Sequence, residues 1–365
     1  MKKKILVTDG ISENAKKMLE EKYTVDLKKG LSPEELKKEI KNYNAIIIRS
    51  ATKMTSEIIE EANNLEVIGR AGVGIDNVDV KTATKKGIVV VNAPGSNSVS
   101  VAEHAIGLML AIARKIPVAD QSTKSGKWEK SKFKGMEIEG KTIGIVGFGK
   151  IGYLVAKKAA GLGMKVIAYD PFTADEKFSS LGVERANTLD DIYKVADFIT
   201  IHLPKNKDTI GLFNMTEFKK MKKGVVIINS ARGGIIVEKD LAEAIKAGIV
   251  GGAALDVFES EPCQNSPLFE TEKVVCTPHL GASTDEAQDR AGIIIAEQVD
   301  LVLSGKPATF AVNFPAASAE LMEAISPFFE LCDNLGSLFT GLFEGNLNSI
   351  EIGYYGKIAE YDTKI

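Results

Sequence analysis

The stretch Thr142-Ile-Gly-Ile-Val-Gly-Phe-Gly-Lys-Ile-Gly152 decides the fold of this chain. Its first half is β-branched and apolar, and its second half carries Gly147, Gly149 and Gly152 before a helical pattern. In a GxGxxG turn the first glycine allows a tight bend, the second lets the backbone approach a pyrophosphate, and the third lets helix and strand pack closely. The helix N-terminus beyond the turn presents unpaired N–H groups to phosphates. The stretch therefore predicts a dinucleotide-binding turn; the alternative is a glycine-rich packing turn without a ligand.

An acidic residue downstream of the turn indicates which dinucleotide it would bind. Asp170 ends the next predicted strand, 18 residues after Gly152. A carboxylate at this place accepts hydrogen bonds from the ribose hydroxyls and repels a 2′-phosphate. The sequence therefore favours NAD over NADP as cofactor.

Short β-branched runs alternate with charged helical segments on both sides of this turn. The predicted strands are 4–7, 45–49, 67–69 and 89–92, and then 142–146, 165–169, 198–202, 225–229, 252–257 and 274–277. The predicted helices include 12–21, 33–41, 56–62 and 151–161, a long helix that begins near 98–101, and another over 284–304. Such alternation is typical of an α/β fold with mainly parallel sheets. The two series of strands indicate two α/β units.

Length and composition fit a two-domain globular protein. The chain has 365 residues, of which 44% are hydrophobic and 26% charged, and its net charge is only −3. This balance predicts no nucleic-acid or membrane partner. The three cysteines have no CxxC spacing, so we expect free thiols, no metal site and a reducing, cytoplasmic location. The apolar run at the N-terminus is too short for a signal peptide.

Three charged or titratable residues follow predicted strands of the second series. Arg232 lies in Asn-Ser-Ala-Arg-Gly-Gly, Glu261 in Asp-Val-Phe-Glu-Ser-Glu-Pro, and His279 in Thr-Pro-His-Leu-Gly-Ala. An arginine can bind a carboxylate through two parallel hydrogen bonds, and a histidine beside a carboxylate can take a hydroxyl proton. Taken singly, each residue could be structural: a capping arginine, a surface acid or a hydrogen-bonded loop histidine. Together, downstream of a dinucleotide turn, they predict hydride transfer from an α-hydroxy acid.

With these motifs the chain resembles the D-isomer-specific 2-hydroxyacid dehydrogenases over about residues 4–314. The strings that carry the resemblance lie at 49–52, 69–79, 126–128, 142–152, 231–234, 252–258 and 278–283. The resemblance implies a flavodoxin-like substrate-binding domain, residues 1–98 plus 285–315, with a Rossmann-type NAD-binding domain inserted at residues 99–284. It implies a cleft between the two domains, and a homodimer or homotetramer.

The family's residue roles carry over to matching positions. In the family the arginine binds the substrate carboxylate and keto oxygen, the histidine is the acid/base, and the glutamate before proline orients it. These roles fall on Arg232, His279 and Glu261, and not on the neighbouring acid Glu259. The implied cofactor contacts are Val73, Gly147, Gly149, Lys150, Ile151, Gly152, Asp170, Leu203, Ser230, Asp256, His279, Gly281 and Ala282. The implied substrate contacts are Arg49, Ser50, Arg70, Gly72, Arg232, His279 and Lys130.

The choice of substrate rests on the cations at the ends of first-series strands. A phosphorylated acid needs such cations, and Arg49 and Arg70 meet that need unless they are ordinary solvated side chains. The resemblance is closest to family members that oxidise D-3-phosphoglycerate with NAD, the first step of serine biosynthesis. An enzyme for hydroxypyruvate, glycerate or another D-2-hydroxy acid is the alternative. An NAD-sensing, corepressor-like binding protein is a further one.

The sequence also predicts where the other two histidines and the C-terminal residues lie. His202 ends a predicted strand and is expected to be structural or adjacent to the cofactor, and His104, on an apolar helix face, is expected in the core. A helix is predicted over 316–342 and a strand over 348–355. Residues 316–365 resemble the opening of the intervening domain that precedes a serine-binding domain in larger family members. We expect the remainder of that region to be absent, which leaves feedback inhibition by serine in doubt.

Overall fold

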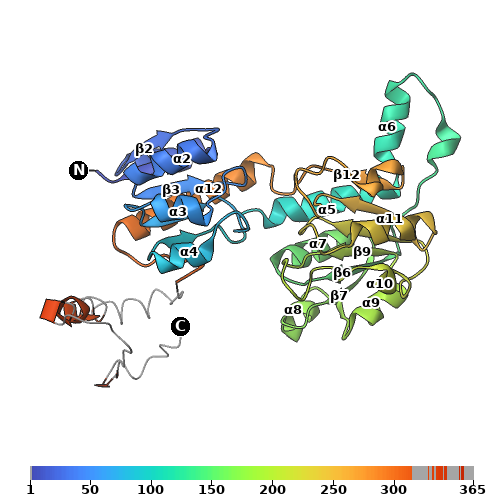
Figure 1. The fold of residues 1–365 in the computed structure, drawn as a ribbon. Coiled ribbons are helices and arrows are strands. Elements are labelled where there is room, and N and C mark those ends of the chain that lie inside the picture. Colours follow the sequence, from blue (N-terminus) through green and yellow to red (C-terminus); the bar gives the residue numbers. More distant parts are fainter. Residues whose placement is uncertain are drawn as a thin grey trace. The chain divides into compact units, whose positions relative to one another are not determined.

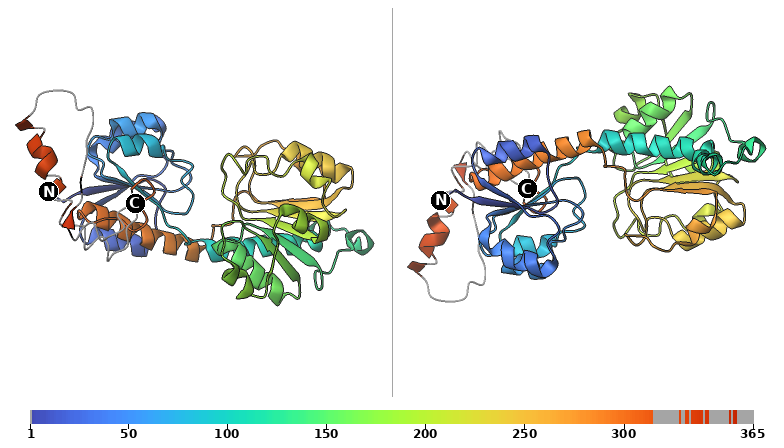
Figure 2. Two further views of the ribbon diagram at one scale, coloured as in Figure 1. Left: turned by 90° about the horizontal axis from the view of Figure 1, so that it is seen from below. Right: turned by 90° about the horizontal axis from the view of Figure 1, so that it is seen from above.

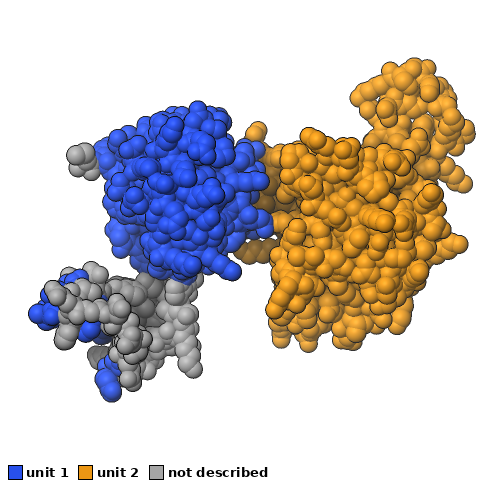
Figure 3. All heavy atoms as spheres, in the orientation of Figure 1, with its two compact units in different colours: residues 1–96, 288–365 blue, residues 97–287 orange. Residues whose placement is uncertain are grey.

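Two separate parallel β-sheets organise the chain in this computed structural model (Figure 1). The structure describes residues 2–314 together with 328, 331–332, 334–339, 341–342, 353 and 355–356. Each sheet belongs to its own unit: residues 1–96 with 288–365 form unit 1, and residues 97–287 form unit 2 (Figure 3). The predicted α/β fold with mainly parallel sheets is confirmed. The helix and strand predicted within residues 316–365 lie outside the described residues, apart from the few positions named above.

Unit 1 contains a sheet with the strand order β2-β1-β3-β4-β5. The strands are β1 (Lys4–Val7), β2 (Thr24–Leu27), β3 (Ala45–Ile48), β4 (Val67–Arg70) and β5 (Val89–Val91). The central strand β3 reads Ala-Ile-Ile-Ile, and all four residues are buried. A strand covered on both faces needs such a continuous apolar run.

Helices flank both faces of this sheet (Figure 2). The helices are α1 (Glu13–Glu20), α2 (Pro33–Glu39), α3 (Ser56–Glu61), α4 (Val80–Lys85) and α12 (Asp285–Leu303), with a 3-10 turn η1 (Ile40–Asn42). Apolar side chains of α1 and α12 share one core cluster, and those of α2, α3 and α4 share another. Ser32 caps α2 as its sequence predicts: Ser32 Oγ accepts from the Glu35 N–H, and the Glu35 carboxylate accepts from the Ser32 N–H.

Unit 2 contains a sheet with the strand order β12-β11-β10-β9-β6-β7-β8. The strands are β6 (Thr142–Val146), β7 (Lys165–Tyr169), β8 (Glu184–Arg185), β9 (Phe198–Ile201), β10 (Val225–Asn229), β11 (Val250–Leu255) and β12 (Val274–Cys276). The chain runs from β6 outward to β7 and β8, and then returns to the other side of β6 with β9. This reversal creates a switch point between β6 and β9. In open α/β sheets, ligands bind beyond the carboxyl ends of the strands at such a point.

Two helical layers cover the sheet of unit 2. The helices are α5 (Ser98–Ala113), α7 (Lys150–Gly161), α8 (Asp175–Ser179), α9 (Leu189–Val195), α10 (Met215–Phe218) and α11 (Glu238–Lys246). Side chains of α5, α7 and α8 share one core cluster, and those of α9, α10 and α11 share the other. Helix α6 (Ile116–Lys124) and the 3-10 turn η2 (Lys130–Phe133) contribute no buried residue.

In the described part of the chain no helix combines the length and apolar character needed to cross a bilayer.

The observed strands agree closely with the predicted ones. The strands β1, β6, β7 and β10 have the predicted bounds, and the bounds of six others differ by one or two residues. The strands β2 and β8 were not predicted. Both are exposed or half-buried and pair with a single neighbour at the edge of a sheet, so neither needs a continuous apolar run.

The packing of α12 on β4 yields a stability prediction for unit 1. Ile295 is fully buried, and a Cβ placed on Gly69 would lie only 2.9 Å from Ile295 Cγ2. We expect Ile295→Ala to lower the free energy of unfolding of this unit by about 2–5 kcal/mol, because it leaves a cavity that close-packed neighbours cannot refill. Hydrogen exchange of the β3 and β4 amides would measure this loss. Glu297→Ala on the exposed side of the same helix is the control; an equal loss in both variants would contradict the packing argument.

Candidate active site

The glycine turn joins β6 to α7 at the switch point of unit 2. Gly147 has a φ of 95°, and a Cβ there would lie 2.5 Å from the His202 carbonyl oxygen. A Cβ on Gly152 would overlap the Gly147 carbonyl oxygen, so the helix approaches the turn too closely for a side chain. At Gly149 a Cβ would meet nothing within 4 Å. Two glycines therefore allow close packing, and the third leaves its backbone facing open space.

The residues around this turn fit a dinucleotide. Gly149 is the N-cap of α7 and provides no side-chain hydrogen bond, so the first N–H groups of the helix remain available to a pyrophosphate. Asp170 follows β7, and its carboxylate accepts hydrogen bonds from Phe148 N at 2.8 Å and Phe172 N at 2.9 Å. These bonds fix the acid beside the turn, where a ribose would reach it. Ser230 follows β10, and its buried hydroxyl oxygen has no hydrogen-bond partner among the described residues.

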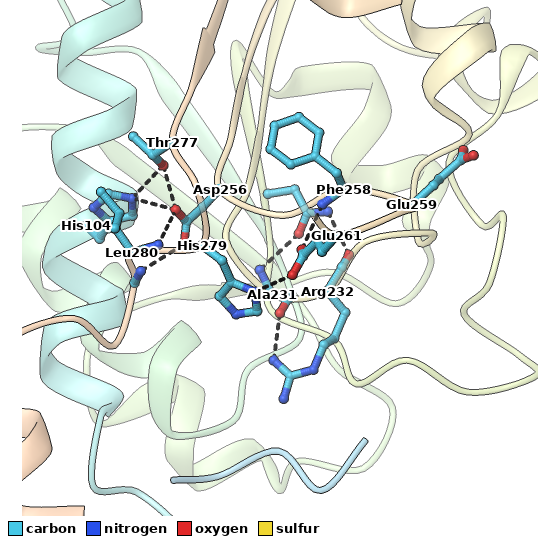
Figure 4. A network of polar contacts seen from close by, with 12 residues as sticks. His104, Ala231, Arg232, Asp256, Phe258, Glu259, Glu261, Thr277, His279 and Leu280 are labelled. Carbon is cyan, nitrogen blue, oxygen red and sulfur yellow. Dashed lines mark hydrogen bonds and ion pairs between the residues drawn. The ribbon is translucent and has the colours of Figure 1, made fainter. Parts of the chain in front are cut away.

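Three loops bring Arg232, Glu261 and His279 together beyond β10, β11 and β12 (Figure 4). His279 Nδ1 lies 2.7 Å from Glu261 Oε2, and Glu261 Oε1 accepts from the Phe258 N–H at 3.0 Å. The side chains of His279 and Glu261 are 49% and 36% exposed in this chain. A neutral ring that donates through Nδ1 presents its unprotonated Nε2 outward. This geometry is that of an acid–base histidine oriented by a carboxylate.

The loop that carries Arg232 is held by the last residue of β10. Asn229 Nδ2 donates to the Arg232 carbonyl at 2.9 Å, and Asn229 Oδ1 accepts from Ala231 N at 3.0 Å. The Arg232 guanidinium donates to the Ala231 carbonyl at 2.7 Å. Because a guanidinium carries five N–H donors, this bond leaves others for an anion.

Electrostatics favour a charged pair of His279 and Glu261. The hydrogen bond that His279 donates to Glu261 raises the pKa of His279 against the opposing effect of burial. The charges of Glu261 and Asp256 add to the rise, and that of Arg232 opposes it. Burial works to raise the pKa of Glu261, but the hydrogen bonds from His279 and from the Phe258 N–H outweigh it, and the net pKa is lowered. The histidine therefore binds a proton more readily than a free one.

The residues that follow His279 form a tight turn that is hydrogen-bonded to Asp256. This carboxylate is fully buried, and it accepts hydrogen bonds from Thr277 Oγ1, Leu280 N and Gly281 N at 2.5, 2.7 and 2.8 Å. The structure shows the Asp256 oxygens bonded to this turn, and the expected contact of Asp256 with the cofactor stays a prediction. Gly281 and Ala282, also expected near the cofactor, lie in or directly after this turn.

The structure separates the roles of His104 and His202. The expectation that His104 packs in an apolar core is wrong: its ring is 23% exposed and lies 3.2 Å from Asp256 Oδ1 and 3.0 Å from Thr277 Oγ1. Sequence reasoning missed this contact, although a histidine on an apolar helix face was a visible signal. His202 is buried, burial lowers its pKa to about 4, and its Nε2 lies 2.9 Å from Thr200 Oγ1. A neutral, enclosed ring of this kind suits a structural role.

The remaining expected cofactor contacts occupy loop and helix starts. Lys150 and Ile151 begin α7, and Leu203 follows His202 after β9. Val73 belongs to unit 1, where Asn92 Nδ2 donates to its carbonyl at 2.7 Å.

The expected substrate cations of unit 1 lie at the carboxyl ends of β3 and β4. Arg49 Nη1 donates to Gln288 Oε1 at 3.1 Å. Asp9 holds the loop of Arg49, because its carboxylate accepts from Arg49 N at 2.6 Å and from Thr52 N at 3.0 Å. Arg70 ends β4 with its guanidinium folded over Gly72, and Ser50 is exposed. Lys130 begins η2 in unit 2.

Among the described residues no group of His, Cys, Asp and Glu has metal-binding geometry.

Comparisons with known proteins identify the family of this chain. A sequence model of the D-isomer specific 2-hydroxyacid dehydrogenase NAD binding domain matches residues 106–281. A D-3-phosphoglycerate dehydrogenase of Archaeoglobus fulgidus is 47% identical over 363 residues, covering 99% of this chain and 69% of that protein. One of Methanocaldococcus jannaschii is 47% identical over 362 residues, with 99% and 69% covered.

Solved structures show the same fold. The PH0520 protein of Pyrococcus horikoshii superposes with a TM-score of 0.70 at 33% identity, covering 89% of this chain and 97% of that one. A glyoxylate reductase of Paecilomyes thermophila gives a TM-score of 0.77 at 27% identity, with 85% and 98% covered.

The close approach at Gly152 predicts how NAD binding depends on the turn. We expect Gly152→Ala to weaken NAD binding by about tenfold or more, because its methyl group would push α7 away from the turn and from the pyrophosphate. Gly161→Ala is the matched control at the other end of α7, where a Cβ meets nothing within 4 Å. Calorimetric titration of both variants with NAD measures the effect. Wild-type affinity in Gly152→Ala would contradict the assigned geometry.

Proposed function

This chain belongs to the D-isomer-specific 2-hydroxyacid dehydrogenase family, and on that premise we propose that it oxidises D-3-phosphoglycerate to 3-phosphohydroxypyruvate with NAD. The observation that carries the chemistry is the 2.7 Å contact between His279 Nδ1 and Glu261 Oε2, with Arg232 beside it. The similarity to D-3-phosphoglycerate dehydrogenases over 99% of the chain supports the substrate. The reaction is the first step of serine biosynthesis.

The proposed mechanism assigns one task to each group of the site. Bound NAD supplies the hydride acceptor. Arg232 binds the substrate carboxylate through two N–H donors and orients the C2 carbon. His279 Nε2 accepts the proton of the C2 hydroxyl as hydride leaves the same carbon. Glu261 holds the ring through Nδ1 and stabilises the imidazolium that forms, as its own lowered pKa requires.

We propose that Arg49 and Arg70 of unit 1 bind the substrate phosphate. A guanidinium matches phosphate geometry with paired N–H donors, and both side chains start from carboxyl ends of neighbouring parallel strands. Asp9 strengthens this assignment because it fixes the backbone of the Arg49 loop through two hydrogen bonds. Ser50 and Gly72 complete the proposed contact loops.

We further propose that the enzyme acts in the cytoplasm as a homodimer or homotetramer. Helix α6 and the following turn contribute no buried residue, and Trp128 between them is 88% exposed. Such an uncovered segment fits burial against a second copy of the chain. Lys130 in this segment is then available to a neighbouring subunit.

The substrate assignment is tested by a panel of acids. Purified protein would be assayed for NADH formation with D-3-phosphoglycerate, D-glycerate and D-2-hydroxyglutarate, each with NAD and with NADP. We expect turnover with the phosphorylated acid and NAD, because the cations of unit 1 and Asp170 select these two. Turnover of an unphosphorylated acid alone would keep the chemistry and overturn the substrate.

Assaying the Arg49→Ala variant with the same acids tests whether Arg49 binds the phosphate. We expect KM for the phosphorylated acid to rise about tenfold to a hundredfold, the range of a lost charged hydrogen bond. KM for an unphosphorylated acid should stay within a few-fold. Lys53→Ala, which removes an exposed cation four residues away, is the control.

The raised pKa of His279 predicts the pH profile of oxidation. The histidine must be unprotonated to accept a proton, so kcat/KM rises with pH through its pKa, above the ordinary value near 6.5. Glu261→Gln removes the main cause of that rise, so the acid limb should move to lower pH while kcat falls. Glu259→Gln, a nearby acid bonded to Glu238 rather than to the histidine, is the matched control. An unmoved limb in Glu261→Gln would remove Glu261 from the mechanism.

A further inference from the structure

Three consecutive backbone N–H groups after β12 point at a single residue. His279 N donates to the Asp256 carbonyl at 2.8 Å, Leu280 N to its Oδ1 at 2.7 Å, and Gly281 N to its Oδ2 at 2.8 Å. Successive N–H groups of a tight turn make a concave site for an anion. Here the anion is the protein's own buried carboxylate, so Asp256 determines the shape of the turn.

The turn holds His279 in an uncommon backbone conformation. Its φ is 56°, in the left-handed region that residues other than glycine seldom adopt. Such a conformation persists only where the surroundings over-determine it. The direction of the imidazole, and hence its contact with Glu261, therefore depends on Asp256 keeping its charge and its place.

A buried carboxylate keeps its charge only if donors satisfy it. Burial works to raise the pKa of Asp256, but hydrogen bonds from His104, Thr277, Leu280 and Gly281 outweigh it and lower the pKa. The hydroxyl of Thr277 donates to Asp256 Oδ1, so its oxygen accepts from His104 Nε2 at 3.0 Å. His104 therefore donates through Nε2 toward both the hydroxyl and the carboxylate.

His104 is the donor that comes from a different layer of the fold. It lies on α5, whereas Asp256 and Thr277 follow the adjacent strands β11 and β12 (Figure 4). Helix α5 packs against both strands. The contact links this long helix to the turn that carries His279, without contact between His104 and the reacting groups.

We propose that His104 is a positioning residue for catalysis: by donating to Asp256 and Thr277 it holds the 277–281 turn so that His279 meets Glu261. This inference rests on the proposed acid–base role of His279. It gives His104, which lies outside the cluster of Arg232, Glu261 and His279, a role in the reaction. It also predicts that His104 affects the pKa of His279.

The test compares two substitutions at one position. His104→Gln keeps an N–H donor at similar reach, whereas His104→Leu has similar bulk and no donor. We expect His104→Leu to lower kcat about tenfold or more and to move the acid limb of kcat/KM to lower pH, because a looser turn weakens the hydrogen bond that His279 donates to Glu261. His104→Gln should restore most of both values. Glu103→Gln, a change on the same helix as His104 that breaks a surface ion pair with Lys158 of α7, is the control.

A readout that does not need turnover separates this proposal from the proposed function. The chain has only three histidines, so ring NMR signals can be assigned by substituting each one. The titration of His279 reports the groups that face it, which are Glu261, Asp256 and Arg232. We expect its midpoint to fall in His104→Leu and to return in His104→Gln, whichever acid the wild-type enzyme oxidises.

Two results would overturn the proposal. One is an unchanged midpoint and acid limb in His104→Leu; the other is equal damage from Leu and Gln, which would indicate packing alone. If His104→Leu does not fold, Thr277→Val removes the hydroxyl that His104 contacts and must lower the His279 midpoint in the same way. A wild-type enzyme that oxidises none of the acids would refute the proposed function, but the NMR comparison would still decide the role of His104.

Discussion

The chemistry proposed for this chain depends on one interaction, the hydrogen bond between His279 and Glu261. Its partners come from loops after the adjacent parallel strands β12 and β11, so the sheet brings their starting points to one edge. A 2.7 Å contact between two half-exposed side chains still needs both loops to be held. Phe258 N–H holds Glu261, and Asp256 holds the turn of His279. The geometry of this pair, to which we assign the proton transfer, thus depends on backbone hydrogen bonds at the ends of two neighbouring strands.

The glycine turn and the loops that carry Arg232 and His279 lie at the same edge of the sheet for one structural reason. In a parallel sheet every strand delivers its carboxyl end to the same edge, and the order of the strands reverses between β6 and β9. Gly147 and Asp170 follow β6 and β7, and Arg232 and His279 follow β10 and β12. A turn suited to a dinucleotide and a cluster suited to proton transfer are therefore parts of one edge.

Residues within local motifs could be predicted from the sequence, whereas contacts between distant segments could not. The glycine turn and the strand Thr142–Val146 lie in one short, patterned stretch, whereas the pairing of His279 with Glu261 was implied only by the family resemblance. The edge strand β8 is two exposed residues long, so no periodicity marks it. His104 was expected in an apolar core because its helix face is apolar. Its partner Asp256 lies 152 residues later, and only the folded sheet reveals that a buried carboxylate faces the helix.

The central claim is that His279 transfers the proton while the chain's other groups bind and orient. His279→Asn tests it most directly, because asparagine keeps a polar side chain but cannot exchange a proton near neutral pH. The measurement is kcat for oxidation of the accepted hydroxy acid, together with NAD affinity by calorimetry. The account predicts a fall in kcat of about 10²–10⁴-fold with nearly unchanged NAD affinity. Turnover within a few-fold of wild type would contradict it.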